Sequence, residues 1–203
     1  MSPDQPKKLR SDAAENAERV MAAAIRAGLG VGRNVPLAQI AAEAGVGIGT
    51  LYRRYPNRAA LLEALQLRAY RLLLAEAEDA LASGTSGVDS IERYLRQSFQ
   101  HRDQLVLPLH GVPNTEGTES ARVRDQLKVV MAAIIERGHA DGTLRPEVTG
   151  WTVVRFGAML AQPMTNVPGW AESAAEQRSV FIRGITTPAG LAGDDEIGSE
   201  LSK

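Results

Sequence analysis

Between residues 36 and 56 the sequence leaves room for two short helices joined by a tight turn. Proline suits the first position of a helix, because the N–H that it lacks has no partner there. Behind Pro36, four apolar residues share one helical face at i, i+3, i+4 and i+7 spacing: Leu37, Ile40, Ala41 and Ala44. Gly45 follows where a left-handed residue often ends a helix, and a second helix over 48–55 must stop at Pro56. This order predicts a helix-turn-helix, whose second helix can lie in the major groove of DNA.

Helical periodicity continues over most of the remaining chain, and alternating strand-like patterns are nearly absent. We expect further helices over 12–27, 58–82, 89–102, 118–140, 149–164 and 171–185, with Ser11 or Asp12 capping the first and Asn57 capping the 58–82 helix. The predicted fold class is all-α: a three-helix head with the helix-turn-helix and a larger C-terminal helical bundle. The expected parts are a flexible basic arm over 1–10, the head over 11–60, the bundle over 61–187 and a disordered tail over 188–203.

Charge divides the chain into two parts of opposite sign. Residues 1–70 contain ten Lys/Arg and six Asp/Glu, whereas the whole chain has 23 and 24. A basic first third on an acidic remainder favours an anion-binding module joined to another function. There is no cysteine, which excludes disulfides and thiolate metal sites. No apolar run reaches the roughly 18 residues of a membrane span, and the N-terminus lacks a signal-peptide pattern, so we expect a cytoplasmic protein.

The 48–55 helix has two different faces. Ile48, Leu51 and Tyr55 are spaced i, i+3 and i+7 and are predicted to face the core of the head. The outer face then carries hydrogen-bond donors: Thr50, Arg53 and Arg54, with Tyr52 near the edge. Arginine can bind guanine through both arms of its guanidinium, and hydroxyls can donate to phosphate. Gly47 and Gly49 carry no side chain, so a partner could approach the backbone closely.

The stretch PLAQIAAEAGVGIGTLYRRYPNRAALLEAL, together with the helix before it, resembles the DNA-binding domain of the TetR/AcrR family of bacterial transcriptional regulators. The resemblance covers roughly residues 12–65, and its most specific parts are Ala44-Gly45-Val46 and Gly49-Thr50-Leu51-Tyr52. It implies an all-helical homodimer with a small DNA-binding head and a larger body that binds a small-molecule effector and dimerises. It also implies that Thr50, Tyr52 and Arg53 meet DNA, and that Arg58 meets a phosphate where the family usually has lysine.

The chain departs from the family pattern at two helix starts. Gly47 stands where serine commonly caps the second helix, which costs only a few tenths of a kcal/mol. Pro36 and Leu37 stand where threonine is frequent and often touches phosphate. The full set of expected DNA-binding residues is Pro36, Leu37, Gly47, Gly49, Thr50, Tyr52, Arg53, Arg54 and Arg58.

The second part of the chain carries weaker signals. The stretch Thr152–Met164 and the helix from Ala171 have the small-plus-bulky composition of helices that pack in pairs, which makes them dimer-interface candidates. Candidate effector-lining residues are Phe99, Arg102, His110, Met131, Trp151, Phe156 and Met159, with His101 and Leu105 as additional candidates. A methionine or aromatic residue at helical spacing is, however, more often part of a core.

Other classes of function receive less support. The three histidines show neither HExxH nor i, i+4 pairing, so we expect no metal site and no cofactor. Convergent polar groups of an enzyme are not found, and we expect no catalytic activity. The favoured function is a ligand-responsive repressor that binds a palindromic operator as a dimer. The alternative is a helical protein-interaction adaptor, or a small-molecule-binding protein without specific DNA recognition.

Overall fold

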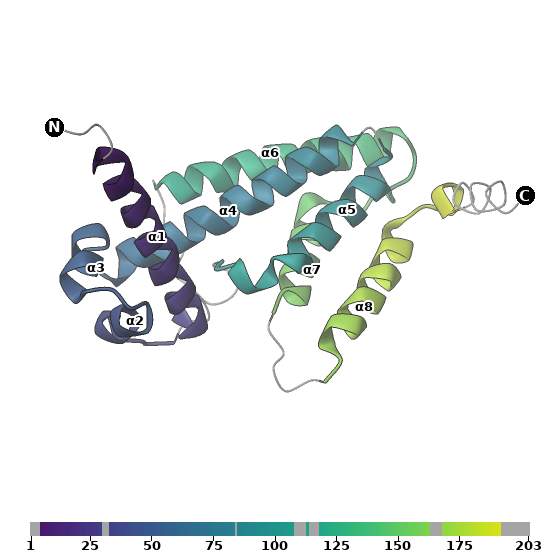
Figure 1. Ribbon diagram of the computed structural model, residues 1–203. Coiled ribbons are helices and arrows are strands. Elements are labelled where there is room, and N and C mark those ends of the chain that lie inside the picture. Colours follow the sequence, from purple (N-terminus) through teal and green to yellow (C-terminus); the bar gives the residue numbers. More distant parts are fainter. Residues whose placement is uncertain are drawn as a thin grey trace, which may run out of the picture. The chain divides into compact units, whose positions relative to one another are not determined.

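The computed structural model describes residues 5–29, 33–83, 85–107, 113, 118–162 and 168–191, with side chains from Asp12 onward. Helices make up most of these residues (Figure 1). They are α1 (Gln5–Arg26), α2 (Leu37–Glu43), α3 (Ile48–Arg54), α4 (Arg58–Ala82), α5 (Gly87–Gln100), the short 3₁₀ helix η2 (Arg102–Gln104), α6 (Glu119–Ala140), α7 (Gly150–Leu160) and α8 (Trp170–Ile185). Within the described ranges, β pairing is limited to one bridge between Leu144 and Thr186. The all-α prediction is confirmed.

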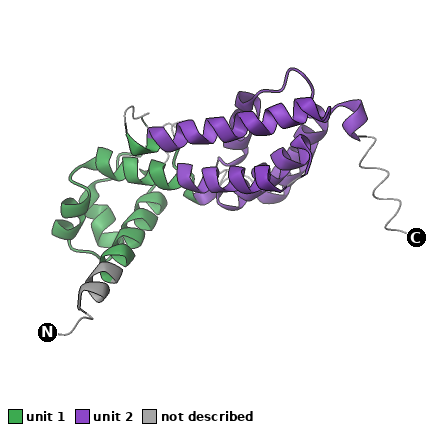
Figure 2. Cartoon of the chain, turned by 90° about the horizontal axis from the view of Figure 1, so that it is seen from above, with its two compact units in different colours: residues 1–69, 104–120 green, residues 70–103, 121–203 purple. Residues whose placement is uncertain are grey.

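The chain divides into two compact units (Figure 2). The N-terminal unit comprises residues 1–69 and 104–120, and the C-terminal unit comprises 70–103 and 121–203. Helix α4 contributes its first part to one unit and its remainder to the other. The N-terminal unit therefore extends past the expected boundary at residue 60 and includes a later segment of the chain.

The core of the N-terminal unit is built from α1, α2, α3 and the start of α4. Helix α1 packs on α2, and α2 packs on α3. Its buried residues include Ala24, Leu29, Ile40, Leu51, Leu61, Leu65 and, from the later segment, Val106. Ile40 and Ala41 lie on the buried face of α2, as their spacing predicts.

The turn between α2 and α3 has the expected glycine geometry. Gly45 has φ +64°, a left-handed conformation that residues with a side chain rarely adopt. The Gly45 N–H donates to the Ala42 carbonyl at 3.1 Å, and the Val46 N–H donates to the Ala41 carbonyl at 3.0 Å. These two bonds form a Schellman motif, which satisfies the last carbonyls of α2 and turns the chain into α3.

Of two predictions about helix starts, one is confirmed and the other is wrong. Asn57 caps α4 as predicted, since its Oδ1 accepts from the Ala60 N–H at 2.9 Å. The first helix, in contrast, begins at Gln5 and not with a cap at Ser11 or Asp12. No glycine or proline interrupts residues 7–26, and Pro6 in the first turn is compatible with a helix. Helix α1 thus includes much of the segment expected to be a flexible arm.

In the C-terminal unit, α5 packs against both α7 and α8. The start of α5 lies directly on α6, because a Cβ placed on Gly87 would come within 2.1 Å of the Gly138 Cα. Helix α5 begins with Ser86, whose hydroxyl accepts from the Asp89 N–H, and α7 begins with a capping box between Thr149 and Thr152. Residues 188–191 add one helical turn at the start of the segment expected to be a tail.

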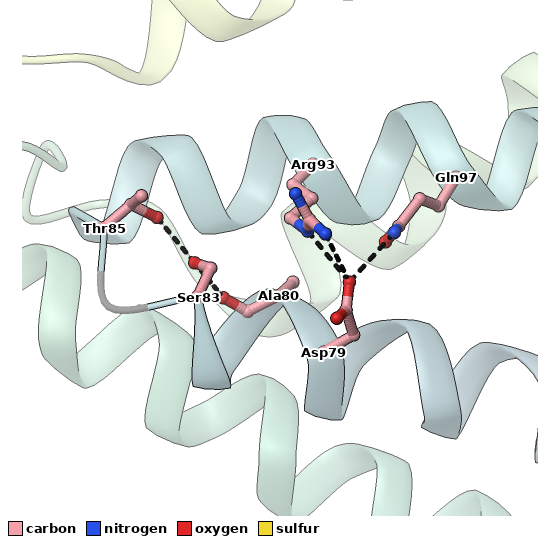
Figure 3. Close-up of polar contacts among 6 residues, drawn as sticks. All are labelled: Asp79, Ala80, Ser83, Thr85, Arg93 and Gln97. Atoms are coloured by element: carbon pink, nitrogen blue, oxygen red, sulfur yellow. Dashed lines mark hydrogen bonds and ion pairs between the residues drawn. The ribbon is translucent and has the colours of Figure 1, made fainter.

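Polar contacts join the end of α4 to α5 (Figure 3). The Asp79 carboxylate accepts from Arg93 Nε at 2.9 Å and from Gln97 Nε2 at 3.0 Å. Beyond α4, the Ser83 hydroxyl donates to the Ala80 carbonyl at 2.7 Å and lies 2.7 Å from the Thr85 hydroxyl. These contacts fix the antiparallel pairing of the two helices across a short loop. Among the described residues, no helix combines the length and the apolar character that crossing a membrane requires.

Candidate nucleic-acid interface

Helix α3 presents most of its polar side chains to solvent, as its sequence predicts. Tyr52 is 47% exposed, and Arg53 and Arg54 are exposed, whereas Thr50 is half-buried. Leu51 and Tyr55 are buried in the core of the N-terminal unit. The outer face of α3 is therefore the donor-rich surface that the sequence indicates.

One residue of α3 does not follow the predicted pattern. Ile48 was expected to face the core, but it is 42% exposed. It is the first residue of the helix and directly follows the N-cap Gly47, at the end of α3 where few residues of the same helix surround it. The expectation was wrong because helical spacing places a residue on a face but does not say how far along the helix the core extends. The exposed Ile48 adds an apolar side chain to the outer surface of α3.

The arginines of α3 have no carboxylate partner among the residues that the structure describes. Within the described part of the chain, neither Arg53 nor Arg54 forms an ion pair. The Arg54 guanidinium lies 5.9 Å from the centre of the Tyr55 ring, at the outer limit of a cation–π contact. Two cationic groups on one exposed face can thus meet an external anion without breaking an internal contact.

A groove of about 380 Å³ runs between α1 and α3. Its polar lining includes Asp12 and Asn16 from α1 and Thr50, Arg53 and Arg54 from α3. Sequence reasoning considered Asp12 only as a helix cap and did not name Asn16. They come next to α3 only through the packing of helices far apart in the sequence, and nothing in their local pattern signals this.

The starts of α2 and α3 carry no side-chain cap. Pro36 and Gly47 occupy the two N-cap positions, both with extended backbone, and neither makes a side-chain hydrogen bond. A Cβ added at Gly49 would meet nothing within 4 Å, so packing within the chain does not require glycine there. Pro36 is exposed, whereas Leu37 is half-buried and packs against the core. Free backbone N–H groups therefore lie at both helix starts.

Arg58 has different surroundings from the α3 arginines. It lies in the first turn of α4 and is half-buried. Its Nη1 donates to the Val35 carbonyl at 3.3 Å, and its Nη2 donates to the Arg33 carbonyl at 2.5 Å. The guanidinium that the resemblance assigns to a phosphate is thus engaged by the backbone of the segment before α2.

The expected effector-lining residues differ in exposure. Trp151 and Met159 are 57% and 67% exposed, whereas Met131 is buried. Phe156 stacks on Phe181 of α8 with ring centres 3.8 Å apart. The remaining candidates have separate local settings. The Arg102 guanidinium lies 4.5 Å from the centre of the Phe99 ring, Leu105 is buried in the N-terminal unit, and His110 lies outside the described residues.

A buried carboxylate in the C-terminal unit went unnoticed in the sequence. Glu76 of α4 accepts a hydrogen bond at Oε2 from the Ser98 hydroxyl at 2.8 Å. Its Oε1 is buried without a hydrogen-bond partner, and His101 Nε2 lies 3.7 Å from it. Burial raises the pKa of Glu76, while the Ser98 hydrogen bond and the His101 charge oppose this. Burial also raises the pKa of Tyr94, and the nearby Glu76 charge adds to that effect. In its alanine- and glutamate-rich helix Glu76 resembles a solvated residue, so only the fold reveals it.

No cluster of three or more potential metal-ligating side chains is found in the residues that the structure describes. His101 pairs with a single carboxylate, and the ring of His139 lies 3.2 Å from the Arg145 carbonyl oxygen. Each of these two histidines thus has a polar neighbour within its own unit.

Comparison with known proteins identifies the first part of the chain. Residues 20–65 match the family model TetR_N, "Bacterial regulatory proteins, tetR family". This range contains the whole helix-turn-helix, including the Schellman turn and the exposed face of α3. No curated protein matches the chain significantly.

Solved structures share the fold over most of the chain. A TetR regulatory protein from Mycobacterium vanbaalenii is 21% identical with a TM-score of 0.59, over 88% of this chain and 99% of that one. A TetR regulator from Streptomyces coelicolor is 24% identical with a TM-score of 0.57, over 85% and 99%. A tetR family regulatory protein from Rhodococcus RHA1 is 21% identical with a TM-score of 0.65, over 84% and 96%. The helical fold of this chain is therefore shared with these three structures.

Proposed function

We propose that this chain is a TetR family regulator that binds a palindromic operator as a homodimer and acts as a repressor, because residues 20–65 match the model of that family and the fold is shared with solved TetR proteins. The observation that carries this proposal is the outer face of α3. There, two arginines that form no ion pair within the described ranges lie beside an exposed tyrosine and a threonine. Such a face suits base edges and phosphates, and it has no evident role inside the protein.

The residues of this surface take different roles in the proposal. Arg53 and Tyr52 read base edges, and Thr50 and Arg54 donate to the phosphate backbone. Gly47 and Gly49 allow the DNA to approach the start of α3, where free N–H groups are oriented toward it. Pro36 and Leu37 bring the start of α2 close to the backbone of the DNA, although neither side chain can donate a hydrogen bond.

Dimerisation follows from the geometry of recognition and from one exposed apolar face. One helix of seven residues reads few base pairs, whereas two copies related by a twofold axis read two half-sites. On α7, Trp151, Arg155 and Met159 follow one another at i, i+4 and i+8, and all three are exposed. Arg155 lies 5.2 Å from the centre of the Trp151 ring, and Val180 of α8 is exposed as well. We assign this face of α7 and α8 to the contact with a second copy.

A small-molecule effector would bind in the C-terminal unit. Of the candidate residues, Phe99, Arg102, Met131 and Phe156 remain suited to this role, because they are buried or half-buried. The exposure of Trp151 and Met159 suits the dimer face better. An effector would release DNA only through its different affinity for the DNA-bound and free conformations.

Selection of bound sequences from random duplex DNA at physiological salt tests the proposed function. Recovery of one inverted repeat is the expected result, because two α3 helices related by a twofold axis read the same half-site in opposite directions. Recovery of no motif, with binding only at low salt, would mean that the arginine-rich face is a generic anion surface. The protein-interaction adaptor would then become the better reading.

A further inference from the structure

Arg58 bridges two parts of the N-terminal unit that are distant in sequence. It belongs to the first turn of α4, and its two terminal nitrogens bind the carbonyls of Arg33 and Val35. Both carbonyls belong to the segment that leads directly into α2. One side chain therefore ties the start of α4 to the chain just before the helix-turn-helix.

Besides Arg58, two backbone hydrogen bonds and the packing of Val35 against the core position the segment 33–35 in the part of the chain that the structure describes. The Arg33 N–H donates to the Gly28 carbonyl at 3.1 Å, and the Val35 N–H donates back to the Arg33 carbonyl at 3.0 Å. The Arg33 carbonyl thus accepts from both Val35 and Arg58. The first contact anchors the segment to the end of α1, and Arg58 anchors it to α4.

Helix α2 depends on this segment for the placement of its first turn. Its N-cap is Pro36, which has no N–H and no side chain able to cap. The Pro36 carbonyl accepts from the Gln39 and Ile40 N–H groups at 3.1 and 3.2 Å, so the first turn of α2 is built on that residue. A shift of residues 33–35 would move Pro36 and with it the start of α2.

We propose that Arg58 is a positioning residue for DNA recognition, which acts through the 33–35 segment on the start of α2 and does not itself contact a phosphate. The proposal rests on the proposed function, since it concerns the surface that meets the operator. It explains why this position carries arginine. A guanidinium can serve two carbonyls with separate nitrogens, whereas the point charge of lysine has no such fork.

Electrostatics also favour an internal role. A cation in the first turn of a helix opposes the positive end of the helix dipole, and the first turn of α4 has no acidic residue to offset it. The two carbonyl oxygens supply partial negative charge at the guanidinium. Moving Arg58 onto a phosphate would leave the carbonyl of the half-buried Val35 and that of the exposed Arg33 without this donor.

Two variants separate positioning from phosphate contact: Arg58→Lys keeps the charge and loses the fork, and Arg58→Gln loses the charge. Each is titrated with the selected operator and with an unrelated duplex over a series of salt concentrations. Both variants are expected to bind the operator about tenfold more weakly, the equivalent of ~1.4 kcal/mol, with the salt dependence of wild type. A phosphate contact would instead leave Arg58→Lys near wild type and lower the salt slope of Arg58→Gln by about one per subunit. That result would overturn the proposal.

Amide hydrogen exchange tests the same tie without DNA. In both variants the Gln39 and Ile40 amides are expected to exchange faster, because the first turn of α2 is less well held. The Val46 amide at the other end of α2 is the internal control and is expected to keep its protection. Unchanged protection at Gln39 and Ile40 would overturn the proposal. If wild type selected no DNA motif, the proposed function would fail while this exchange result would still decide whether the tie exists.

Arg53→Gln is the matched control for both measurements. It removes a guanidinium that forms no internal ion pair in the described chain, so it is expected to weaken operator binding and leave exchange in α2 unchanged. Faster exchange in Arg53→Gln as well would show that loss of any arginine loosens the head. Arg58 would then lose its special role.

Discussion

Arg53 and Arg58 are chemically identical, but the fold gives them opposite surroundings. Arg53 is exposed on α3, whereas Arg58 is half-buried and donates to two carbonyls. The sequence predicted a DNA contact for both arginines, because that prediction used only the residue type and the position in the helix. The difference between the two arginines depends on a hydrogen bond from Arg58 to the Arg33 carbonyl, which no local sequence pattern predicts.

Arg53→Ala is expected to weaken binding to the operator more than binding to unrelated DNA. If Arg53 reads a base edge, the loss is about 1–3 kcal/mol and the preference at one operator position relaxes. Fluorescence anisotropy with the operator, its single-base variants and an unrelated duplex measures this. An equal loss on all three would make Arg53 a phosphate contact.

Glu76→Gln is expected to change how stability depends on pH. The pKa of Glu76 is raised above its ordinary value of 4.5 by burial, so the native state holds this proton more tightly than the unfolded state does. As pH rises from that value through the raised pKa, the unfolded state ionises first and the free energy of unfolding falls. In Glu76→Gln this fall disappears, while the amide oxygen can still accept from Ser98.

Urea unfolding at a series of pH values measures this effect. Glu78→Gln, which changes an exposed carboxyl on the same helix, is the matched control. A pH dependence in Glu76→Gln as steep as that of wild type would show that burial of Glu76 contributes nothing to it.

At the scale of the helices, Gly49→Ala is expected to separate stability from function. The added methyl group meets open space and raises helix propensity, so the free energy of unfolding increases by up to about 1 kcal/mol. The same methyl group stands on the face of α3 that we propose to contact DNA, so operator affinity is expected to fall. Thermal unfolding and DNA titration of the same preparation give both values.

The conclusion from Gly49→Ala depends on the direction in which the free energy of unfolding and the operator affinity change. Higher stability with unchanged operator affinity would place the DNA away from the start of α3. Lower stability would mean that the helix needs glycine there for its own packing.

Most helices could be predicted because their ends carry strong local signals. Gly45, Pro56 and Asn57 fix the limits of α2, α3 and α4 through backbone conformation and capping, which act within a few residues. At the start of α1 a local signal misled the prediction, because Ser11 and Asp12 are good capping residues but the helix continues through them to Gln5. The groove between α1 and α3 and the burial of the Glu76 carboxylate could not be predicted from the sequence, since both depend on which helices pack together.

At the scale of the whole molecule, the proposed dimer can be tested through α7. Trp151→Glu places a charge in an exposed apolar face, so it is expected to weaken self-association strongly and to have little effect on folding. Sedimentation velocity over a range of concentrations measures the effect. Val129→Glu, at an exposed apolar position on α6, is the control and is expected to keep the wild-type state.

A dimeric Trp151→Glu variant would remove this face from the interface. Loss of dimerisation in both variants would instead point to a general effect of added charge. If only Trp151→Glu became monomeric, its operator binding should fall as well, because two half-sites would no longer be bound together.

The chain contains two tryptophans, at the starts of α7 and α8, and the N-terminal unit contains none. Their emission therefore reports only on the C-terminal unit. Self-association through α7 should cover the exposed indole of Trp151 and shift the emission spectrum to shorter wavelength. DNA bound at the N-terminal unit, which has no tryptophan, should leave the emission spectrum nearly unchanged. The native protein thus carries its own optical label for assembly, which can be followed separately from recognition without attaching a dye.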